Sequence, residues 1–228
     1  MSFHEQLLQQ SADARQGLLA TPIIQGCLRG DVSLPSYVAF LREAYHHVRH
    51  TVPLLKATKA ALPPHHAWLR GPLDEYIEEE AGHDEWILND IAQAGGDRAA
   101  AAASAPAIAT EAMIAYAYDT VMRRNPLGFF GMVHVLEGTS VALALAAADR
   151  IQQALDLPTR AFTYLRSHGE LDKEHVNDLA AILARLTEAE DREAVIGCAR
   201  GIYWLYGQVF RGLDVPPAVA TLPQRRTA

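Results

Sequence analysis

Cysteine is scarce in this sequence. Cys27 and Cys198 are the only cysteines among its 228 residues, and they do not form a CxxC pair. This excludes a disulfide framework and a cysteine-based zinc or dithiol motif, and it suits a reducing compartment. The N-terminal stretch MSFHEQLLQQ also lacks the basic start and apolar core of a signal peptide. We therefore expect a cytoplasmic protein.

Basic clusters and long apolar runs are missing as well. No basic run exceeds a pair such as Arg123-Arg124, and the net charge is -7. A nucleic-acid-binding surface is therefore not expected. No stretch reaches the roughly 18 uninterrupted apolar residues of a membrane-spanning helix, because the longest candidate ends at Asp149-Arg150. We expect no membrane insertion.

Helix-forming residues, in contrast, are abundant. Leu, Ala and Glu dominate, runs of β-branched residues are few, and Pro and Gly fall between helical stretches. The alanine-rich stretch before Ala107 reads as a loose connection. The pattern predicts helices over residues 3–19, 22–29, 34–61, 65–94, 108–123, 126–155, 159–185 and 188–213. Without an internal repeat or a linker, the chain predicts one all-α bundle over residues 1–215, followed by a flexible tail at 216–228.

Two local signals refine this pattern. Pro53 interrupts the helix expected over residues 34–61, so we expect a kink around residues 49–53. Thr187 and Glu190 have the spacing of a capping box, which predicts the start of the last helix.

The first candidate for chemistry is Glu80-x-x-His83. Residues three apart on a helix share a face, so both side chains could reach one metal ion. Glu-x-x-His is also the recurring device of di-iron carboxylate bundles. The spacing often arises by chance, however. The neighbouring Glu78, Glu79 and Glu85 equally indicate an acidic, solvent-facing surface.

The second candidate is the stretch HGELDKEHVNDL at residues 168–179. His168, Asp172 and His175 lie at i, i+4 and i+7, which places them within roughly 60° of one another around a helix. Such a stripe could point inward together, or it could be a solvated ridge. Imidazole and carboxylate groups are ligands that iron and manganese accept.

The third candidate is Glu137, in a helix expected to be apolar nearly all round. An isolated buried carboxylate is costly, and no Lys or Arg lies between Pro126 and Asp149 to pair with it. A bound cation would resolve this, as would a tyrosine hydrogen bond or protonation. His134, one turn earlier, is either a hydrogen-bond donor to a metal ligand or an ordinary core histidine.

A fourth helix offers Glu43, His46, His47 and His50. Glu43, His47 and His50 repeat the i, i+4, i+7 spacing, and Pro53 frees a backbone carbonyl nearby. Each of the four is a candidate metal ligand or substrate contact, and the pattern does not choose among them. Taken together, the four helices carry candidate ligands that could meet inside one bundle.

The order of these motifs resembles a known superfamily, the haem-oxygenase-like di-iron oxidases and oxygenases. The similarity covers about residues 10–213 and implies the haem-oxygenase-like bundle of seven to eight helices. The superfamily includes a 1-alkene-forming fatty-acid decarboxylase and a protein that makes p-aminobenzoate. The matching motifs are Glu80-x-x-His83, Glu137 in LEGTS, and His168-x-x-x-Asp172-x-x-His175.

By carry-over from this resemblance, those six residues would hold two Fe ions, or a Mn/Fe pair, with one carboxylate bridging. Some members add a carboxylate from an earlier helix. Here the only acid in that helix is Glu43, and its register does not match the family pattern securely. A histidine from the same helix in that role would be a departure from the family.

The resemblance further implies a small-molecule substrate and O2 as co-substrate. Because the chain carries no flavin or nicotinamide motif, an external reductant is needed, and a separate electron-donor protein is one source. The fold is also compatible with a homodimer. An apolar tunnel for a fatty-acid-like substrate could form from small and aromatic residues around Glu137, although the same residues suit plain core packing: Phe129, Phe130, Met132, Ala142, Ala144 and Ala146.

Two other classes of function stay open. The chain could be a metal-free relative of the same fold, similar to thiaminase II or to the final oxidase of pyrroloquinoline quinone synthesis. The helix expected over residues 126–155 lacks the cysteine nucleophile of thiaminase II, and the interior carries carboxylates and imidazoles where the quinone-forming oxidase has basic groups. A bundle that binds metal or a partner without turnover is the other alternative.

Overall fold

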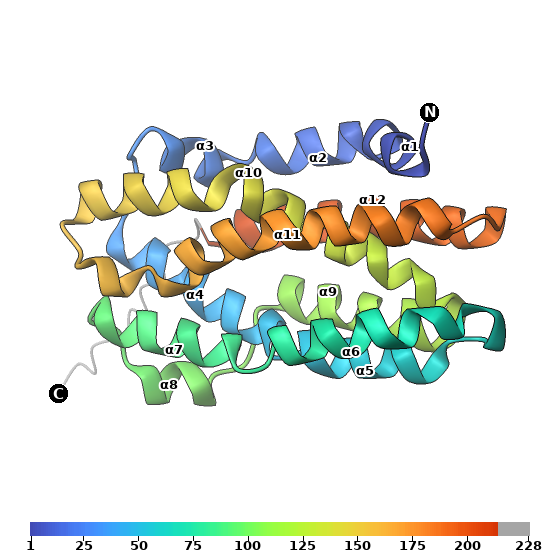
Figure 1. Ribbon diagram of the computed structural model, residues 1–228. Coiled ribbons are helices and arrows are strands. Elements are labelled where there is room, and N and C mark those ends of the chain that lie inside the picture. Colours follow the sequence, from blue (N-terminus) through green and yellow to red (C-terminus); the bar gives the residue numbers. More distant parts are fainter. Residues whose placement is uncertain (214–228) are drawn as a thin grey trace, which may run out of the picture.

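The computed structural model describes residues 1–213, except for the side chain of Lys173, and the tail expected at 216–228 lies outside this range. The described chain is helical throughout and contains no strand (Figure 1). The α-helices are α1 (Phe3–Gln10), α2 (Ala12–Leu19), α3 (Pro22–Leu28), α4 (Leu34–Val48), α5 (Thr51–Ala61), α6 (Arg70–Glu79), α7 (His83–Gln93), α8 (Arg98–Ala103), α9 (Ile108–Asp119), α10 (Phe129–Leu155), α11 (Thr163–Arg185) and α12 (Ala189–Gly212). Short 3-10 or π segments join some of them: η1 (Pro64–Leu69), η2 (Thr120–Arg124), η3 (Pro126–Gly128) and η4 (Thr159–Ala161).

The all-α bundle and the kink before Pro53 are confirmed. The helix expected over 34–61 stops at Val48 and resumes at Thr51, so that Arg49 and His50 form the break. The helix expected over 3–19 is likewise interrupted, at Ser11, whose hydroxyl donates to the Leu7 carbonyl at 2.7 Å.

Three expectations about local structure are wrong. The helix expected over 65–94 divides into η1, α6 and α7, and the stretch read as a loose connection contains α8. Thr187 and Glu190 form no capping box, because α12 begins one residue later than that motif requires, with Glu188 at the N-cap. A complete capping box does occur at the start of α1, between Ser2 and Glu5.

The break between α6 and α7 is centred on Gly82. Its φ of 90° lies in the left-handed region, where a side chain would be strained and glycine is not. The backbone therefore turns at residues 80–82 instead of continuing the helix of residues 70–79.

The long helix α10 packs against both α11 and α12, and the three helices run through the middle of the molecule (Figure 1). In the same view α1–α3 run along one side of them and α4–α9 along the other. The segment Pro126–Leu155 is long and apolar enough to cross a membrane by length and composition. That composition also suits a core helix, which is the position of α10 in this bundle.

The buried apolar side chains form two separate clusters. One contains Leu73, Val133 and Leu179, and the other contains Ile87, Ala144 and Leu165. Three segments contribute side chains to both apolar clusters: α10, α11 and the pair of helices joined by the α6–α7 turn. A layer of buried polar residues interrupts the apolar pattern in each of these three segments.

Gly131 brings α10 against α12. A Cβ built there would lie 2.3 Å from the Val195 carbonyl oxygen and 2.7 Å from the Ala199 nitrogen, both backbone atoms that cannot move aside cheaply. A Cβ added at Gly138, on the same helix, would have open space for 4 Å around it.

We predict that Gly131→Ala lowers the free energy of unfolding by about 1–3 kcal/mol or more, because overpacking forces the two helices apart. Gly138→Ala, the matched control, should be neutral or stabilising by up to about 1 kcal/mol, as expected for a helical glycine. Urea unfolding followed by circular dichroism measures both. Equal effects of the two substitutions would contradict the close helix crossing.

Candidate metal centre

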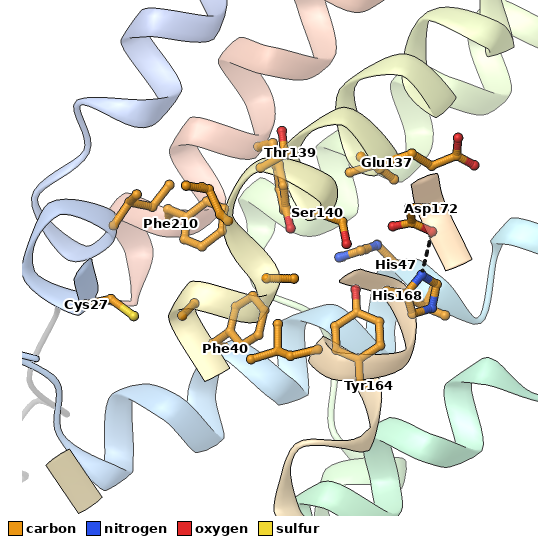
Figure 2. A pocket seen from close by; sticks show the side chains of 18 of the residues that line it. Cys27, Phe40, His47, Glu137, Thr139, Ser140, Tyr164, His168, Asp172 and Phe210 are labelled. Atoms are coloured by element: carbon orange, nitrogen blue, oxygen red, sulfur yellow. Dashed lines mark hydrogen bonds and ion pairs between the residues drawn. The ribbon is translucent and has the colours of Figure 1, made fainter. Parts of the chain in front are cut away.

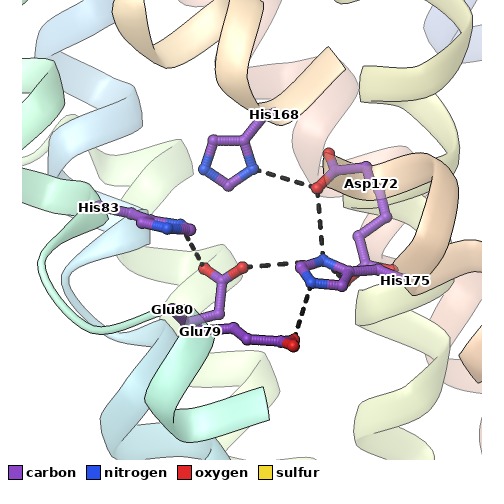
Figure 3. A network of polar contacts seen from close by, with 7 residues as sticks. Glu79, Glu80, His83, His168, Asp172 and His175 are labelled. Atoms are coloured by element: carbon purple, nitrogen blue, oxygen red, sulfur yellow. Dashed lines mark hydrogen bonds and ion pairs between the residues drawn. The ribbon is translucent and has the colours of Figure 1, made fainter. Parts of the chain in front are cut away.

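Six of the residues expected from the sequence meet in the polar layer between the two apolar clusters. Five of them are labelled in Figure 3, and Glu137 is labelled beside Asp172 in Figure 2. Glu80 and His83 come from the α6–α7 turn, Glu137 from α10, and the other three from α11. Ligand atoms of Glu80, His83 and His168 lie within 4.8 Å of one another, and all three residues are buried. We call this group the cluster: Glu80, His83, Glu137, His168, Asp172 and His175.

The stripe on α11 points inward, as its helical phase predicts. His168 Nδ1 lies 3.2 Å from Asp172 Oδ1. His175 Nδ1 lies 3.6 Å from Asp172 Oδ1, 3.6 Å from Glu137 Oε1 and 4.0 Å from Glu80 Oε1. The alternative of a solvated ridge is wrong, because Asp172 and His175 are buried and His168 lies inside the same layer.

Glu80 and His83 converge for a different reason from the one expected. They do not share a face of one helix, since Glu80 follows the last turn of α6 and His83 is the first residue of α7. The turn at Gly82 carries the two side chains together, with His83 Nδ1 3.2 Å from Glu80 Oε2. The three-residue spacing between Glu80 and His83 thus correctly predicts that they lie together. The reason is the turn between α6 and α7, and not one continuous helix.

The cluster has more buried polar atoms than protein partners. Both carboxylate oxygens of Glu137 lack a hydrogen bond in the described structure, as do His83 Nδ1, His168 Nε2 and His175 Nδ1. Leaving a buried donor or acceptor unpaired costs about 1–3 kcal/mol, and more for a charged group. Carboxylate and imidazole atoms that are buried, convergent and without hydrogen bonds among the described residues form a donor set suited to iron or manganese. The residues present therefore fit a metal centre.

The ionisation of the cluster reflects this crowding. Burial, together with the neighbouring Asp172, raises the pKa of Glu137 well above its usual value. Burial opposes protonation of His175, but the carboxylates of Asp172, Glu137 and Glu80 prevail and raise the pKa of its imidazole to about 9. Without a metal the cluster thus retains protons at neutral pH, and a bound cation would have to displace them.

His47 is the member of the fourth helix that lies beside the cluster (Figure 2). Its side chain is buried, and neither ring nitrogen has a hydrogen-bond partner in the described structure. Burial, with the nearby His168, His46 and His50, lowers the pKa of His47 to about 3. A neutral imidazole with two free nitrogens is thereby presented to the cavity beside the cluster, as an additional ligand or as a substrate contact.

Glu43 is directed elsewhere, in contrast to its expected place among the ligands. Its carboxylate accepts from the Thr110 hydroxyl at 2.7 Å and from the Ala107 backbone nitrogen at 3.0 Å. A carboxylate at the start of a helix satisfies backbone N–H groups and the helix dipole, which is the role of Glu43 at α9.

The remaining histidines singled out in the sequence also have other contacts. His46 Nε2 lies 2.9 Å from the Ser104 hydroxyl, and His50 Nδ1 lies 3.1 Å from the Tyr118 hydroxyl. His134 packs edge-on against Tyr203. The structure brings none of these three into the cluster.

Two contacts of the cluster do not follow from the sequence pattern. The carboxylate of the exposed Glu79 is hydrogen-bonded to His175 Nε2 at 3.0 Å. From its position in the sequence, Glu79 is expected only to form part of an acidic surface. Trp86 stacks on His83 with ring centroids 4.0 Å apart. The spacing of Trp86, three residues after His83 at the start of a helix, is a signal that could have indicated this contact.

A cavity of about 160 Å³, which we call the chamber, opens beside the cluster. Figure 2 shows Glu137, Asp172, His168 and His47 at one end and Cys27 and Phe210 at the other. Apart from the cluster and His47, the described residues of its lining are uncharged and mostly aliphatic or aromatic. Of the small residues expected to form a tunnel, Ala144 lines the chamber, whereas Ala142 and Ala146 are exposed.

Comparison with solved structures places this architecture among haem-oxygenase-like proteins. A domain of unknown function with a heme oxygenase-like fold from Shewanella denitrificans is 25% identical, with a TM-score of 0.83 over 92% of this chain and 90% of that one. A TenA homologue from Pseudomonas syringae is 14% identical, with a TM-score of 0.72 over 92% and 93%. Heme oxygenase-1 from Synechocystis, solved in complex with heme, is 14% identical, with a TM-score of 0.70 over 94% and 93%.

The fold and the buried cluster thus define a haem-oxygenase-like helical protein, which confirms the expected fold. A family model for iron-containing redox enzymes matches residues 38–207, so the chain belongs to that family. The match includes all six cluster residues. The search of curated proteins found no match.

The buried His134 makes the stability of the fold depend on pH. Burial, together with His4 and Arg15, lowers the pKa of His134 to about 4 from 6.5. Between pH 6.5 and pH 4, His134 is therefore mostly protonated in the unfolded chain and mostly neutral in the folded one. The free energy of unfolding falls as the pH falls through this range.

We predict that this one residue removes about 2 kcal/mol of unfolding free energy between pH 7.5 and pH 5. In a His134→Phe variant the loss over the same interval should be smaller by that amount. Urea unfolding of the metal-free protein at the two pH values measures the difference. An identical loss in both proteins would show that His134 is protonated in the folded state.

Proposed function

We propose that this chain is a di-iron oxidase or oxygenase that uses O2 to oxidise a small lipophilic molecule, with Mn/Fe as an alternative metal pair. The observation that carries the proposal is Glu137. Its two carboxylate oxygens are buried on a long apolar helix and have no hydrogen bond to any described residue, while five further ligand-type side chains converge on the same layer. A metal centre provides these groups with a common partner.

The family membership supports an iron-dependent redox reaction. When bound, iron would supply the reduction of O2, which protein side chains cannot perform. The residues of this chain hold the metal in a buried layer, exclude bulk water and orient the substrate. The reductant must come from outside, and an electron-donor protein is our preferred source. We also retain a cytoplasmic, homodimeric enzyme as part of the proposal.

The chamber supports a lipophilic substrate. Its lining on α10 runs from Phe129 to Ile151, and the part from Glu137 to Ile151 spans roughly 21 Å at 1.5 Å per residue. The polar groups gather at the cluster end, so an elongated apolar molecule would place its reactive end there and its tail against aliphatic side chains (Figure 2). A fatty-acid-like molecule has this shape. No Lys or Arg of the described chain lines the chamber, so a carboxylate head would depend on the metal and the histidines.

The competing functions find less support in these residues. The TenA likeness shows a common fold, and α10 carries no cysteine nucleophile. Cys27 does line the chamber, but near the end remote from the cluster. A metal-free oxidase would leave both Glu137 oxygens without a hydrogen bond among the described residues, with the His175 imidazole at 3.6 Å as an ion-pair partner. A bundle that only binds metal does not require an apolar chamber beside the cluster, whereas an enzyme that oxidises a lipophilic substrate does.

We predict that the wild-type protein binds about two ferrous ions per chain after anaerobic loading, and that Glu137→Gln loses at least half of this iron. Gln keeps the size of the side chain but removes the anionic ligand. Glu85→Gln is the matched control, because Glu85 is an exposed acid outside the cluster. Iron is measured by elemental analysis after desalting, and circular dichroism verifies the fold.

Equal iron in both variants, or near-zero iron in the wild type, would overturn the di-iron proposal. Bound iron without any O2 consumption across a series of lipophilic acids, alcohols and amines would instead favour the passive bundle.

We further predict that Ala147→Phe shifts the substrate preference towards shorter chains, because Ala147 lines the chamber about 15 Å along α10 from Glu137. Ala146→Phe is the control on the same helix, since Ala146 is exposed and does not line the chamber. Fe(II)-dependent O2 consumption is measured with saturated acids of increasing length. An unchanged length profile in Ala147→Phe would show that the substrate does not occupy this part of the chamber.

A further inference from the structure

A second cavity, of about 250 Å³, reaches the cluster from another direction. His175 lines this second cavity, whereas Glu80, Glu137, His168 and Asp172 line the chamber. Tyr76 and Val133 line both, so a wall of single side chains separates the two spaces. The cluster is therefore accessible from two sides that differ in chemistry.

The charged lining of the second cavity is mainly acidic. Glu75, Glu79 and Asp178 contribute carboxylates, and all three are exposed. Besides the imidazole of His175, the basic side chain in the described lining is Arg185, whose guanidinium lies over the Trp68 ring at 3.7 Å from its centroid. We call this cavity the acidic recess.

The two cavities differ in how they would treat a divalent cation. Moving a charge through an apolar passage is opposed by the loss of hydration, which costs several kcal/mol even after relaxation. Outside the cluster, the side chains of the described residues that line the chamber are uncharged along its length. Carboxylates at the mouth of a cleft, in contrast, concentrate cations locally and raise their rate of association by 10- to 1000-fold, as a rough range.

His175 connects the acidic recess with the cluster. Its Nε2 lies 3.0 Å from Glu79, whose side chain is 58% exposed, and its Nδ1 faces Asp172 and Glu137, each at 3.6 Å (Figure 3). Nδ1 has no hydrogen bond in the described structure although His175 is buried. One imidazole thus spans the distance between an exposed carboxylate and two buried ones.

We propose that ferrous ions reach the cluster through the acidic recess, past Glu79 and His175, while the organic substrate uses the chamber. This inference rests on the proposed di-iron function and adds a separate route for the metal. Loading and substrate binding then proceed through different openings, and an occupied chamber does not obstruct the replacement of iron.

The test is the rate of anaerobic iron uptake by the metal-free protein. The variant is Glu75→Gln combined with Asp178→Asn, which removes two carboxylates from the recess and leaves the contact between Glu79 and His175 intact. The matched control is Glu78→Gln, an exposed acid on α6 that lines neither cavity. Ferrous ion alone is mixed with each protein at low ionic strength, and free iron is trapped by a chelator after defined intervals.

We expect the double variant to load iron about tenfold more slowly, in line with the loss of steering charge, and to reach the same final stoichiometry as the wild type. Raising the salt concentration should slow the wild type towards the variant, because screening acts on exposed charges. Glu78→Gln should load within a factor of about two of the wild type, since a single distant charge steers weakly. A saturating lipophilic acid should leave the loading rate of the wild type unchanged.

Equal loading rates in the double variant and the wild type, or loading that a bound lipophilic acid blocks, would overturn the proposed route while leaving the di-iron function intact. Failure of every protein to retain iron would remove the di-iron function and the route with it. Slow loading of Glu78→Gln to the same extent would assign the effect to overall charge and contradict a localised route.

Discussion

The cost of burying three carboxylates governs the arrangement of this protein. Glu80, Glu137 and Asp172 are 6%, 5% and 1% exposed and lie between two apolar clusters. Among the described residues, the ion-pair partners of these acids are histidines, which carry a full charge only when protonated. Several kcal/mol of lost hydration per ion must be compensated. Helices α10 and α11 and the α6–α7 turn are therefore held around a common point that favours a cation.

Helical phase explains how much of the site could be predicted from the sequence. His168, Asp172 and His175 lie on one uninterrupted helix, so their spacing alone determines that they share a direction. Glu137 is identifiable because an apolar helix provides it with no basic neighbour. Both arguments use one segment at a time, and both lead to residues that the fold brings together.

The errors arise where tertiary context decides. Glu43 has the helical spacing of a metal ligand, but its carboxylate instead accepts hydrogen bonds from the start of α9. No pattern within α4 reveals that neighbour. His46 and His47 lie side by side on α4, and only His47 faces the cavity beside the cluster, whereas His50 lies in the break after α4. The helix expected over residues 65–94 is broken between α6 and α7 by the left-handed backbone of Gly82, and the helical periodicity of the sequence does not reveal that break. The second cavity is lined by residues of η1, α6, α10 and α11, so no single segment of the sequence could have predicted it.

The turn at Gly82 gives the cluster two mechanically different halves. Asp172 and the histidines of α11 are fixed by the hydrogen-bonded backbone of a 23-residue helix, as Glu137 is by the 27 residues of α10. Glu80 and His83 are joined by a short turn that lies outside the regular helical hydrogen bonding of α6 and α7. A metal ion that changes radius or coordination number with its oxidation state would find rigid ligands on one side and compliant ligands on the other. The adjustment between oxidation states would thus be confined to the short turn from Glu80 to His83, and the wall of the chamber formed by α10 and α11 would keep its shape.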